Sequence, residues 1–396
     1  ANTELQGALA ILRNRSRDMV RNNDYAERAI ESLTIATVGT GIRPSLSAGK
    51  PRKTAQIKEL FNSWADSIDC DFDNNTTFWG LQELVARCLF EGGECLVVKR
   101  VVPNPIKKVA LQLQVLEPDH IDTLKTGIPT STGGMITQGI EFDSQGRKIA
   151  YWIFPQHPGE YLVNKQPNSI RFLAQDVLHI FRPKRASQLR GEPKGVSTFN
   201  KLRDLEEYSD ATRVQKKVAA CFSVFVTDSA EPMGGAGSDG GYQMERVEPG
   251  MIEYLQPGQD VQFASPPASD GYDEFMMRNL QGVAAGYGVT YEELTRDYSR
   301  VNFTSGRMAN ISFTAAIEVL QRNCIIPKFC QSVLNWFLQI AEVQGLFSGE
   351  VKANWTLPRK PMVSPDVETK ATKDQIRGGI KPWQDAVRES GMDPEE

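Results

Sequence analysis

The chain has 396 residues, of which 40% are hydrophobic, so it can bury more than one core and disorder throughout is excluded. It carries 45 lysines and arginines against 49 aspartates and glutamates, a formal net charge of −4, which argues against a protein that grips nucleic acid through a broad basic surface. The sequence contains no run of about 18 apolar residues and no apolar leader, so we expect neither a membrane-spanning segment nor a visible export signal.

The first part of the chain is predicted to be mainly helical. Apolar residues recur at helical spacing through residues 3–37, and Asn22 and Asn23 interrupt them, which predicts two consecutive helices. Two further amphipathic helices are predicted at residues 54–66 and 78–90. The segment that follows them, CLVVKRVV, has the β-branched residues and alternation of a strand.

Residues 110–181 are predicted to form strands and turns, with a hairpin at Gln145 and Gly146. Helices come first along the chain and the sheet follows. This order favours an α+β body and argues against a doubly wound nucleotide-binding fold.

Two long helices are predicted next, at residues 198–222 and 272–287, the second closed by Gly288. Between them lie a glycine-rich stretch, MGGAGSDGG, which we interpret as a loop tip, and a strand-like segment, MIEYLQPGQDVQFASPP. A strong helical pattern then covers residues 305–343, and Pro327 is expected to kink or split it.

No motif for a catalytic site, a metal or a cofactor is found. The sequence lacks the zinc-protease, serine-hydrolase, paired-cysteine and P-loop patterns, so we expect no enzyme activity and no cofactor. The cysteines match no zinc or redox spacing and are expected to be free thiols in a reducing compartment. The three histidines, His120, His157 and His179, are interpreted as structural or surface residues.

One acidic loop has the beginning of a calcium-binding pattern. Asp69, Asp71 and Asp73 alternate as the first ligands of such a loop do, but Asn74 stands at the glycine position and Gly80 where a bidentate glutamate is needed. We therefore expect a solvated loop rather than a metal site.

The polar segment from Thr295 to Arg307 breaks the helical periodicity and holds four candidate contacts for nucleic acid: Arg296, Arg300, Asn302 and Arg307. Arginine and asparagine side chains contact phosphate without reading base sequence. From composition alone, an exposed connector with incidental charges explains the segment equally well.

The sequence resembles the portal proteins of lambda-like tailed phages. The stretch RDMVRNNDYAERAIESLTIATVGTGIRP resembles the opening signature of that family. Further blocks agree with it in order and spacing: GLQELVARCLFEGGECLVV, LEPDHID, VLHIFRPKRASQLRGEPKGVSTF, and the run from MIEYLQPGQDVQF through VAAGYGVTYEELTRDYSRVNFTSGRMANISF. The resemblance spans nearly the whole chain.

The resemblance implies an α+β portal fold in a homo-oligomeric ring, usually a dodecamer, at one vertex of the capsid. Double-stranded DNA would enter and leave the capsid through the ring. The ring itself would be assembled in the host cytoplasm and carried in the virion. The implied parts are a wing at 1–197, stem helices at 198–222 and 271–288 around a clip at 223–270, a tunnel-loop region at 289–307, a long wing helix at 308–350 and the start of a crown at 351–396.

The implied partners are the major capsid protein, the terminase large subunit and a head-tail connector or adaptor protein, with no membrane. The candidate docking residues for terminase and connector lie in the implied clip: Met233, Gly241, Tyr242, Glu253, Tyr254 and Gln259.

A channel that passes DNA should not hold it. Because each neutralised phosphate strengthens binding, a neutral or acidic wall with a few mobile basic or amide side chains would let the duplex slide. The energy for movement would come from a separate ATPase.

Two other functions remain open from the residues alone. One is an oligomeric capsid adaptor that passes no DNA, and the other is a metal-dependent enzyme that uses the loop from Asp69 to Asp73.

Overall fold

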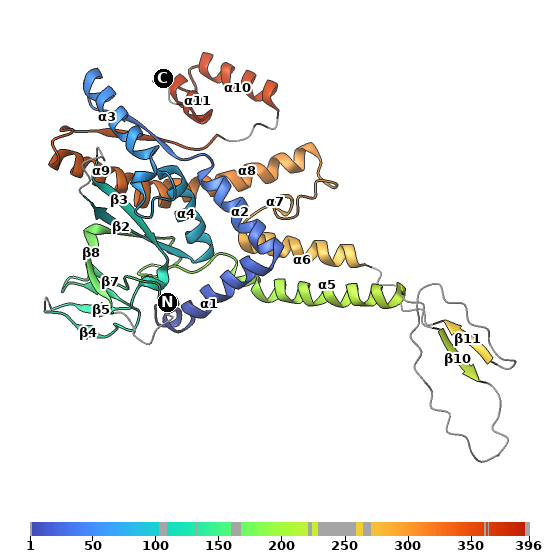
Figure 1. Cartoon of the computed structure of the whole chain (residues 1–396). Helices are drawn as coiled ribbons and strands as arrows, with labels where there is room; N and C mark the ends of the chain where they lie inside the picture. Colours follow the sequence, from blue (N-terminus) through green and yellow to red (C-terminus); the bar gives the residue numbers. More distant parts are fainter. Residues whose placement is uncertain are drawn as a thin grey trace. The chain divides into compact units, whose positions relative to one another are not determined.

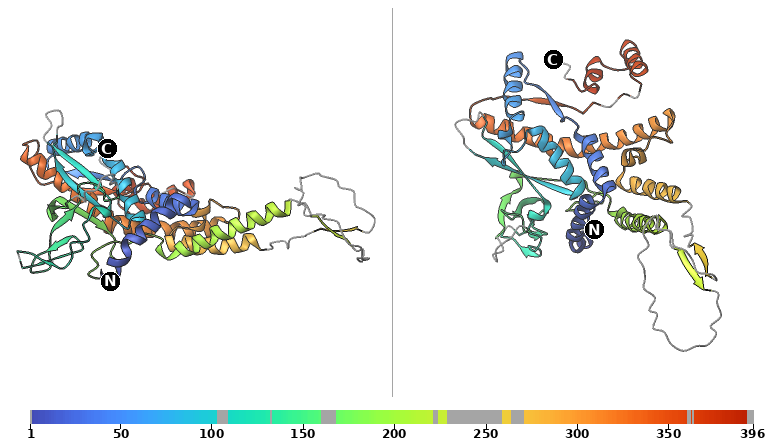
Figure 2. Two further views of the ribbon diagram at one scale, coloured as in Figure 1. Left: turned by 60° about the horizontal axis from the view of Figure 1, so that its bottom comes forward. Right: turned by 45° about the vertical axis from the view of Figure 1, so that its right-hand side comes forward.

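The computed structural model describes residues 2–102, 109–131, 133–159, 168–220, 224–228, 259–263, 271–359, 362 and 364–392. Contacts divide the chain into two compact units, one formed by Ala1–Phe199 with Val283–Glu396 and the other by Asn200–Gly282. Figures 1 and 2 show the helices and strands of both. Each unit is taken by itself below.

The predicted pair of N-terminal helices is confirmed as α1 (Asn2–Asn22) and α2 (Asp24–Val38). Asn23 separates them because its side-chain oxygen accepts the backbone N–H groups of Tyr25 and Ala26, each at 3.1 Å. Such a cap satisfies donors that the first turn of a helix leaves unpaired. The asparagine break therefore starts the second helix.

The next two predicted helices are α3 (Pro51–Ala65) and α4 (Phe78–Glu91), and α4 packs along α2. The extended segment before them, β1 (Arg43–Ser47), pairs antiparallel with β12 (Lys352–Thr356), close to the other end of the chain.

The predicted strands form two antiparallel sheets. In the first, β2 (Glu94–Val101) lies between β3 (Leu111–Leu116) and β9 (Val177–Phe181). The second has five strands in chain order: β4 (Ile128–Pro129), β5 (Met135–Thr137), β6 (Ile140–Phe142), β7 (Lys148–Ile153) and β8 (Ile170–Leu173).

Side chains of both sheets share one apolar core. Leu96 and Val98 of β2 pack there with Ile140 of β6 and Tyr151 and Ile153 of β7. Four single turns of 3-10 helix connect these parts: η1 (Ile68–Cys70), η2 (Pro118–His120), η3 (Ala174–Asp176) and η4 (Val196–Thr198).

The two predicted long helices are α5 (Phe199–Ala220) and α6 (Tyr272–Tyr287). Within the second unit they meet through aromatic rings, since Tyr208 stacks on Tyr272 with ring centres 5.6 Å apart. The same unit contains the antiparallel pair β10 (Val224–Asp228) and β11 (Gln259–Phe263). Gly288, with φ of 74°, ends α6 as predicted.

The predicted helix around Pro327 is divided into three parts: α8 (Phe303–Leu320), the π-helical turn η5 (Gln321–Cys330) and α9 (Gln331–Val343). Proline has no N–H to donate and its ring crowds the preceding turn. Pro327 therefore accounts for the wider, π-helical turn around it. Phe337 of α9 then packs edge-on against Phe61 of α3, with centroids 5.2 Å apart.

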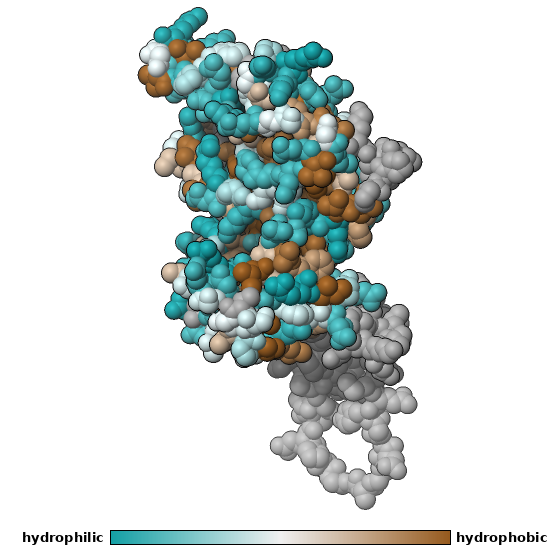
Figure 3. All heavy atoms as spheres, turned by 90° about the vertical axis from the view of Figure 1, so that its left-hand side faces the viewer, coloured by the Kyte–Doolittle hydropathy of each residue, from teal (hydrophilic) through white to brown (hydrophobic). Residues whose placement is uncertain are grey.

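The last described helices are α10 (Pro365–Arg377) and α11 (Trp383–Glu389), neither of which has a buried residue. Among the residues that were searched, no helix combines the length and apolar character needed to cross a membrane. The face in Figure 3 is mostly hydrophilic, with apolar side chains in small groups.

Candidate functional site

The polar segment predicted to contact nucleic acid begins with a short helix that the sequence analysis missed. This helix, α7 (Tyr291–Thr295), starts at Thr290, whose hydroxyl accepts the backbone N–H of Glu293 at 3.1 Å. It is held on α2, because Arg28 Nε donates to the Glu293 carbonyl at 3.2 Å. Leu294 is buried beneath it. The start of the segment is therefore anchored to α2 by the packing of α7.

Arg296 ends α7 in the left-handed region, with φ of 58°. Its backbone N–H reaches the Glu292 carbonyl at 2.8 Å and closes the helix, while the residue itself is exposed. A residue other than glycine pays a steric cost in this conformation, so the cap fixes the point at which the chain turns into the loop.

The loop after Arg296 is organised by its own hydrogen bonds. The Asp297 carboxylate accepts the Ser299 N–H at 2.9 Å and the Tyr291 hydroxyl at 3.5 Å. These bonds, that from Ser299 foremost, lower the pKa of Asp297, and the nearby charge of Arg300 adds to the effect. The loop is thus held by hydrogen bonds among its own residues and α7.

Asn302 marks the far end of the loop. Its side-chain oxygen accepts the Ser305 N–H at 2.8 Å, and the Ser305 hydroxyl accepts the Asn302 N–H at 3.2 Å, which makes a reciprocal cap for α8. Arg307 lies within α8, as the helical pattern predicted from residue 305 indicated. Its assignment to the loop, made from the polar segment that ends at Arg307, is therefore corrected.

The four candidate residues therefore lie in three different structural positions: a loop, a helix cap and the body of a helix. Arg296 and Arg300 belong to the loop, Asn302 caps a helix with its amide oxygen, and Arg307 lies on that helix. All four are exposed.

The candidate docking residues lie mostly outside the described residues: Met233, Gly241, Tyr242, Glu253 and Tyr254. Gln259 is described only as the first residue of β11.

The acidic loop predicted to be solvated is only partly so. Asp71 is buried, and its carboxylate accepts the backbone N–H groups of Asp73, Asn75 and Thr76 at 3.2, 2.9 and 3.2 Å. Both of its oxygens are used to fold the loop. Asp71 therefore has a structural role, whereas Asp73 is exposed as expected.

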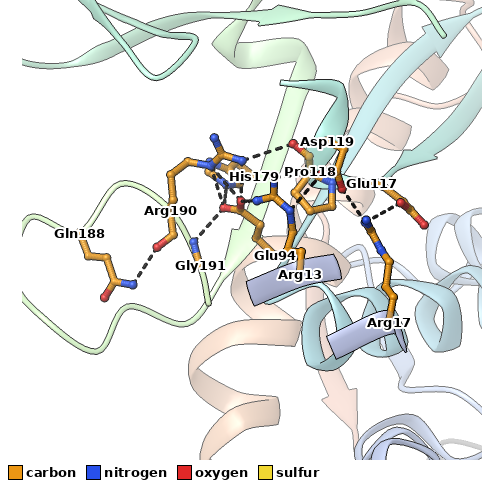
Figure 4. Close-up of polar contacts among 10 residues, drawn as sticks. All are labelled: Arg13, Arg17, Glu94, Glu117, Pro118, Asp119, His179, Gln188, Arg190 and Gly191. Atoms are coloured by element: carbon orange, nitrogen blue, oxygen red, sulfur yellow. Dashed lines mark hydrogen bonds and ion pairs between the residues drawn. The ribbon is translucent and has the colours of Figure 1, made fainter. Parts of the chain in front are cut away.

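A buried cluster of charges, shown in Figure 4, was not predicted from the sequence. At its centre is Glu94, the first residue of β2, with a fully buried side chain. Its carboxylate accepts Arg190 Nε at 2.9 Å, His179 Nε2 at 2.8 Å and the Gly191 N–H at 2.8 Å. Arg13 of α1 lies 3.4 Å from the same group.

Two glycines let the chain come close enough for this cluster. A Cβ on Gly93 would lie 2.2 Å from the backbone of Glu192, and one on Gly191 would lie 2.1 Å from the Gly93 carbonyl oxygen. Only glycine fits such an approach. The GGE and RGEP stretches of the sequence meet here, which places the Gly191 N–H on Glu94.

For both Glu94 and His179, burial and pairing shift the pKa in opposite directions. Burial acts to raise the pKa of Glu94, but the charge of Arg190 and the hydrogen bond from His179 outweigh it and hold that pKa well below its usual range. Burial lowers the pKa of His179 to about 4, although its bond to Glu94 opposes this shift. At neutral pH the cluster contains an ionised glutamate, a neutral histidine and paired arginines.

The cluster continues toward the surface through a second pair of ions. Arg17 of α1 lies 2.6 Å from Glu117 and 2.5 Å from Asp119, and Arg13 lies 3.1 Å from Asp119. Glu117, Asp119 and His157 lie near enough together to hold a metal ion. Arg17 already supplies a positive charge there, so the arrangement fastens α1 to the body.

The cysteines within the described residues are free, as predicted: Cys70, Cys88, Cys95, Cys324 and Cys330. All but Cys88 are buried. Burial raises the pKa of Cys324 and Cys330, which keeps these thiols protonated and unreactive.

Comparison with known proteins gives consistent results. The family described as "Phage portal protein, lambda family" matches residues 1–321. A probable portal protein of Halomonas phage phiHAP-1 is 26% identical over 97% of this chain and 78% of its own length. Portal protein B of Escherichia phage lambda is 22% identical over 94% of this chain and 76% of its own length.

Solved structures share the fold at low sequence identity. A chain from the neck of a native GTA particle, computed with C12 symmetry, has a TM-score of 0.56 and 13% identity, covering 96% of this chain and 94% of that one. A chain from the virion of the native gene transfer agent particle has a TM-score of 0.54 and 12% identity, covering 96% and 93%.

Proposed function

The chain belongs to the lambda family of phage portal proteins, and from this premise we propose that twelve copies close into a ring at one capsid vertex, through which double-stranded DNA is packaged and ejected. The observation that carries the proposal is the family match to residues 1–321, which spans the body, both long helices and the segment before α8. The C12 symmetry of the similar neck chain supports the subunit number.

We assign the parts of the ring to the observed elements. Helices α5 and α6 are the stem, residues 223–270 between them are the clip, and the segment from Arg296 to Asn302 is the tunnel loop. Helices α8 and α9 with η5 form the long wing helix, the sheets and N-terminal helices form the rest of the wing, and the last segment begins the crown.

The tunnel loop is suited to brief contact with a moving duplex. Arg296 and Arg300 are exposed and stand in a loop of few residues whose ends are fixed by caps on α7 and α8. Arginines of this kind can touch phosphates without reading base sequence. With a net charge of −4 over the chain, few basic groups would face the DNA and it would not be held.

The partners follow from the position of such a ring in a particle. The clip would dock the terminase large subunit and later the head-tail connector, while the wing would meet the major capsid protein. The portal proteins form a structural family, and we propose that this chain has no catalytic site, so a separate ATPase would drive the DNA. Assembly in the host cytoplasm and residence in the virion complete the proposal.

Purified protein tests the proposal directly. Negative-stain images and the mass of the intact assembly should show a closed ring of twelve copies with a central hole. A chain that stays monomeric at micromolar concentration, including in the presence of its capsid protein, would contradict it. So would a ring without an opening wide enough for duplex DNA.

A further inference from the structure

Helix α8 is apolar on the side that faces away from its own chain. Because a helix advances by ~100° per residue, Met308, Ile311, Ala315 and Val319 lie along one stripe. Met308 is 65% exposed, Ile311 54% and Val319 48%, and Ala315 is exposed as well. These four residues are called the outer stripe.

The opposite side of α8 is apolar too, and it is used within the chain. Ile317 and Leu320 are buried, and Gln321, just beyond the helix, donates to the Thr37 carbonyl of α2 at 2.7 Å. A helix with apolar side chains on two opposite sides is normally covered on both of them. One side of α8 is covered by its own chain, and the outer stripe needs another cover.

The composition of α8 argues against DNA as that cover. Residues 308–317, MANISFTAAI, contain no charged side chain. Binding to the phosphate backbone depends on lysines and arginines that release counterions, and the outer stripe offers none. The cover must therefore be an apolar protein surface.

A surface of that kind lies on the other side of the same helix. A hollow of about 500 Å³ opens between α2, α7 and α8. Its apolar lining includes Ile35, Ala36, Val301, Phe313 and Pro358, and the charged residues Arg28, Glu292, Glu293, Arg296 and Arg359 line it as well. Protein interfaces combine apolar and polar side chains in this way. This hollow is called the α2–α8 groove.

The two surfaces point in opposite directions from one helix. The residues of α8 that line the groove, among them Ala309, Phe313 and Ile317, are about half a turn from the outer stripe. A pair of different surfaces on opposite sides of a subunit gives head-to-tail contacts, and these close into rings. The similar neck chain comes from an assembly computed with C12 symmetry, in which each copy has two neighbours.

We propose that the outer stripe of α8 in one copy packs into the α2–α8 groove of the next copy around the ring. The occupant of the groove is thus a second copy of this chain. The inference rests on the proposed ring and names the surfaces that close it. It also places the tunnel loop, which precedes α8, beside the contact between neighbours.

Charge on the outer stripe should prevent assembly. In the full chain, Met308→Glu with Ile311→Glu should leave the monomer folded, because both side chains are exposed and glutamate favours helix. The fraction of protein in rings, measured by native mass, should fall at least ~10-fold, because each buried carboxylate would be unpaired. The matched control, Ile11→Glu with Leu84→Glu at residues 55% and 42% exposed, should assemble normally.

A covalent link tests the pairing itself. The double variant Ile35→Cys with Ile311→Cys should give a ladder of disulfide-linked multimers on oxidation, whereas each single variant and the pair Ile11→Cys with Ile311→Cys should not. The absence of a ladder, or rings formed by the glutamate variant, would overturn the inference. Rings that formed but lost another protein partner would also overturn it, in favour of that partner as the cover.

These outcomes are separate from a failure of the proposed function. If the unaltered chain never forms rings, the proposed function and this inference both fail. If the unaltered chain forms rings and the glutamate variant does so equally, only the assignment of these two surfaces is wrong.

Discussion

The arginines of the buried cluster and those of the proposed tunnel loop have opposite environments. Arg13 and Arg190 are buried and meet carboxylates at Glu94, whereas Arg296 and Arg300 are exposed in a loop between two helix caps. A buried charge is tolerated only when it is paired, so the first group fixes how the chain folds. An exposed charge contributes little to folding, so replacing the second group should leave the fold intact.

The largest effect is expected when the centre of the buried cluster loses its charge. Glu94→Gln would leave Arg190 without its anion and Arg13 with Asp119 alone, at a cost of about 3–5 kcal/mol in the free energy of unfolding. Urea denaturation of the purified chain measures this cost. The matched control is Glu207→Gln, whose exposed pair with Arg203 is 3.0 Å long and should contribute no more than ~1 kcal/mol. Equal losses in both variants would contradict the distinction between the two environments.

The pH dependence of folding should follow His179. Its pKa is about 4 in the folded chain and ~6.5 when unfolded, so between these values the unfolded chain binds a proton that the folded chain does not. Stability should therefore fall as the pH drops from about 6.5 toward 4. Glu94, whose pKa folding lowers, adds a further loss at still lower pH.

The variant His179→Gln keeps a donor for Glu94 and removes the titrating ring. Urea midpoints measured from pH 7 to pH 4.5 should then decline less steeply than those of the unaltered chain. Parallel curves for the two proteins would show that His179 does not set this dependence.

A smaller and more local effect is expected at the end of the tunnel loop. Asn302→Ala removes the cap of α8 and should cost ~1 kcal/mol, concentrated in the first turn of that helix. Amide hydrogen exchange around Ser305 should become faster. Asn302→Ser, which can still cap, should retain most of the protection, and equal exchange in both variants would mean that the cap does not hold the loop.

Local patterns predicted the elements better than the site. The break at Asn22 and Asn23 and the disturbance at Pro327 were readable because a cap and a missing N–H act on their own turn of the chain. Helix α7 was missed because five residues are too few to show a helical period. Arg307 was counted with the loop because the polar segment that ends at this residue overlaps the helix predicted from residue 305, and α8 begins at Phe303.

The buried cluster could not be predicted because its members are far apart in sequence. Arg13, Glu94 and Asp119 come from a helix, a strand and a 3-10 turn, and only the folded chain brings them together. Glu94, a charged residue directly before the apolar residues CLVV of its strand, was a local signal. The glycines at this approach, Gly93 and Gly191, are far apart in sequence, so their need for close backbone contact becomes visible only in the folded chain.

The most direct test of the account is the handling of DNA by a ring without the loop arginines. Arg296→Ala with Arg300→Ala should fold as the unaltered chain does, since each exposed charge contributes only ~0–1 kcal/mol. It should also assemble, because Arg296 lines the α2–α8 groove but the apolar side chains of that groove are unchanged. Particles built with this variant should differ in the length of genome packaged or in how much of it they retain. Full-length packaging with normal retention would contradict a role for these arginines in the channel, and loss of assembly would show that they join neighbouring subunits instead.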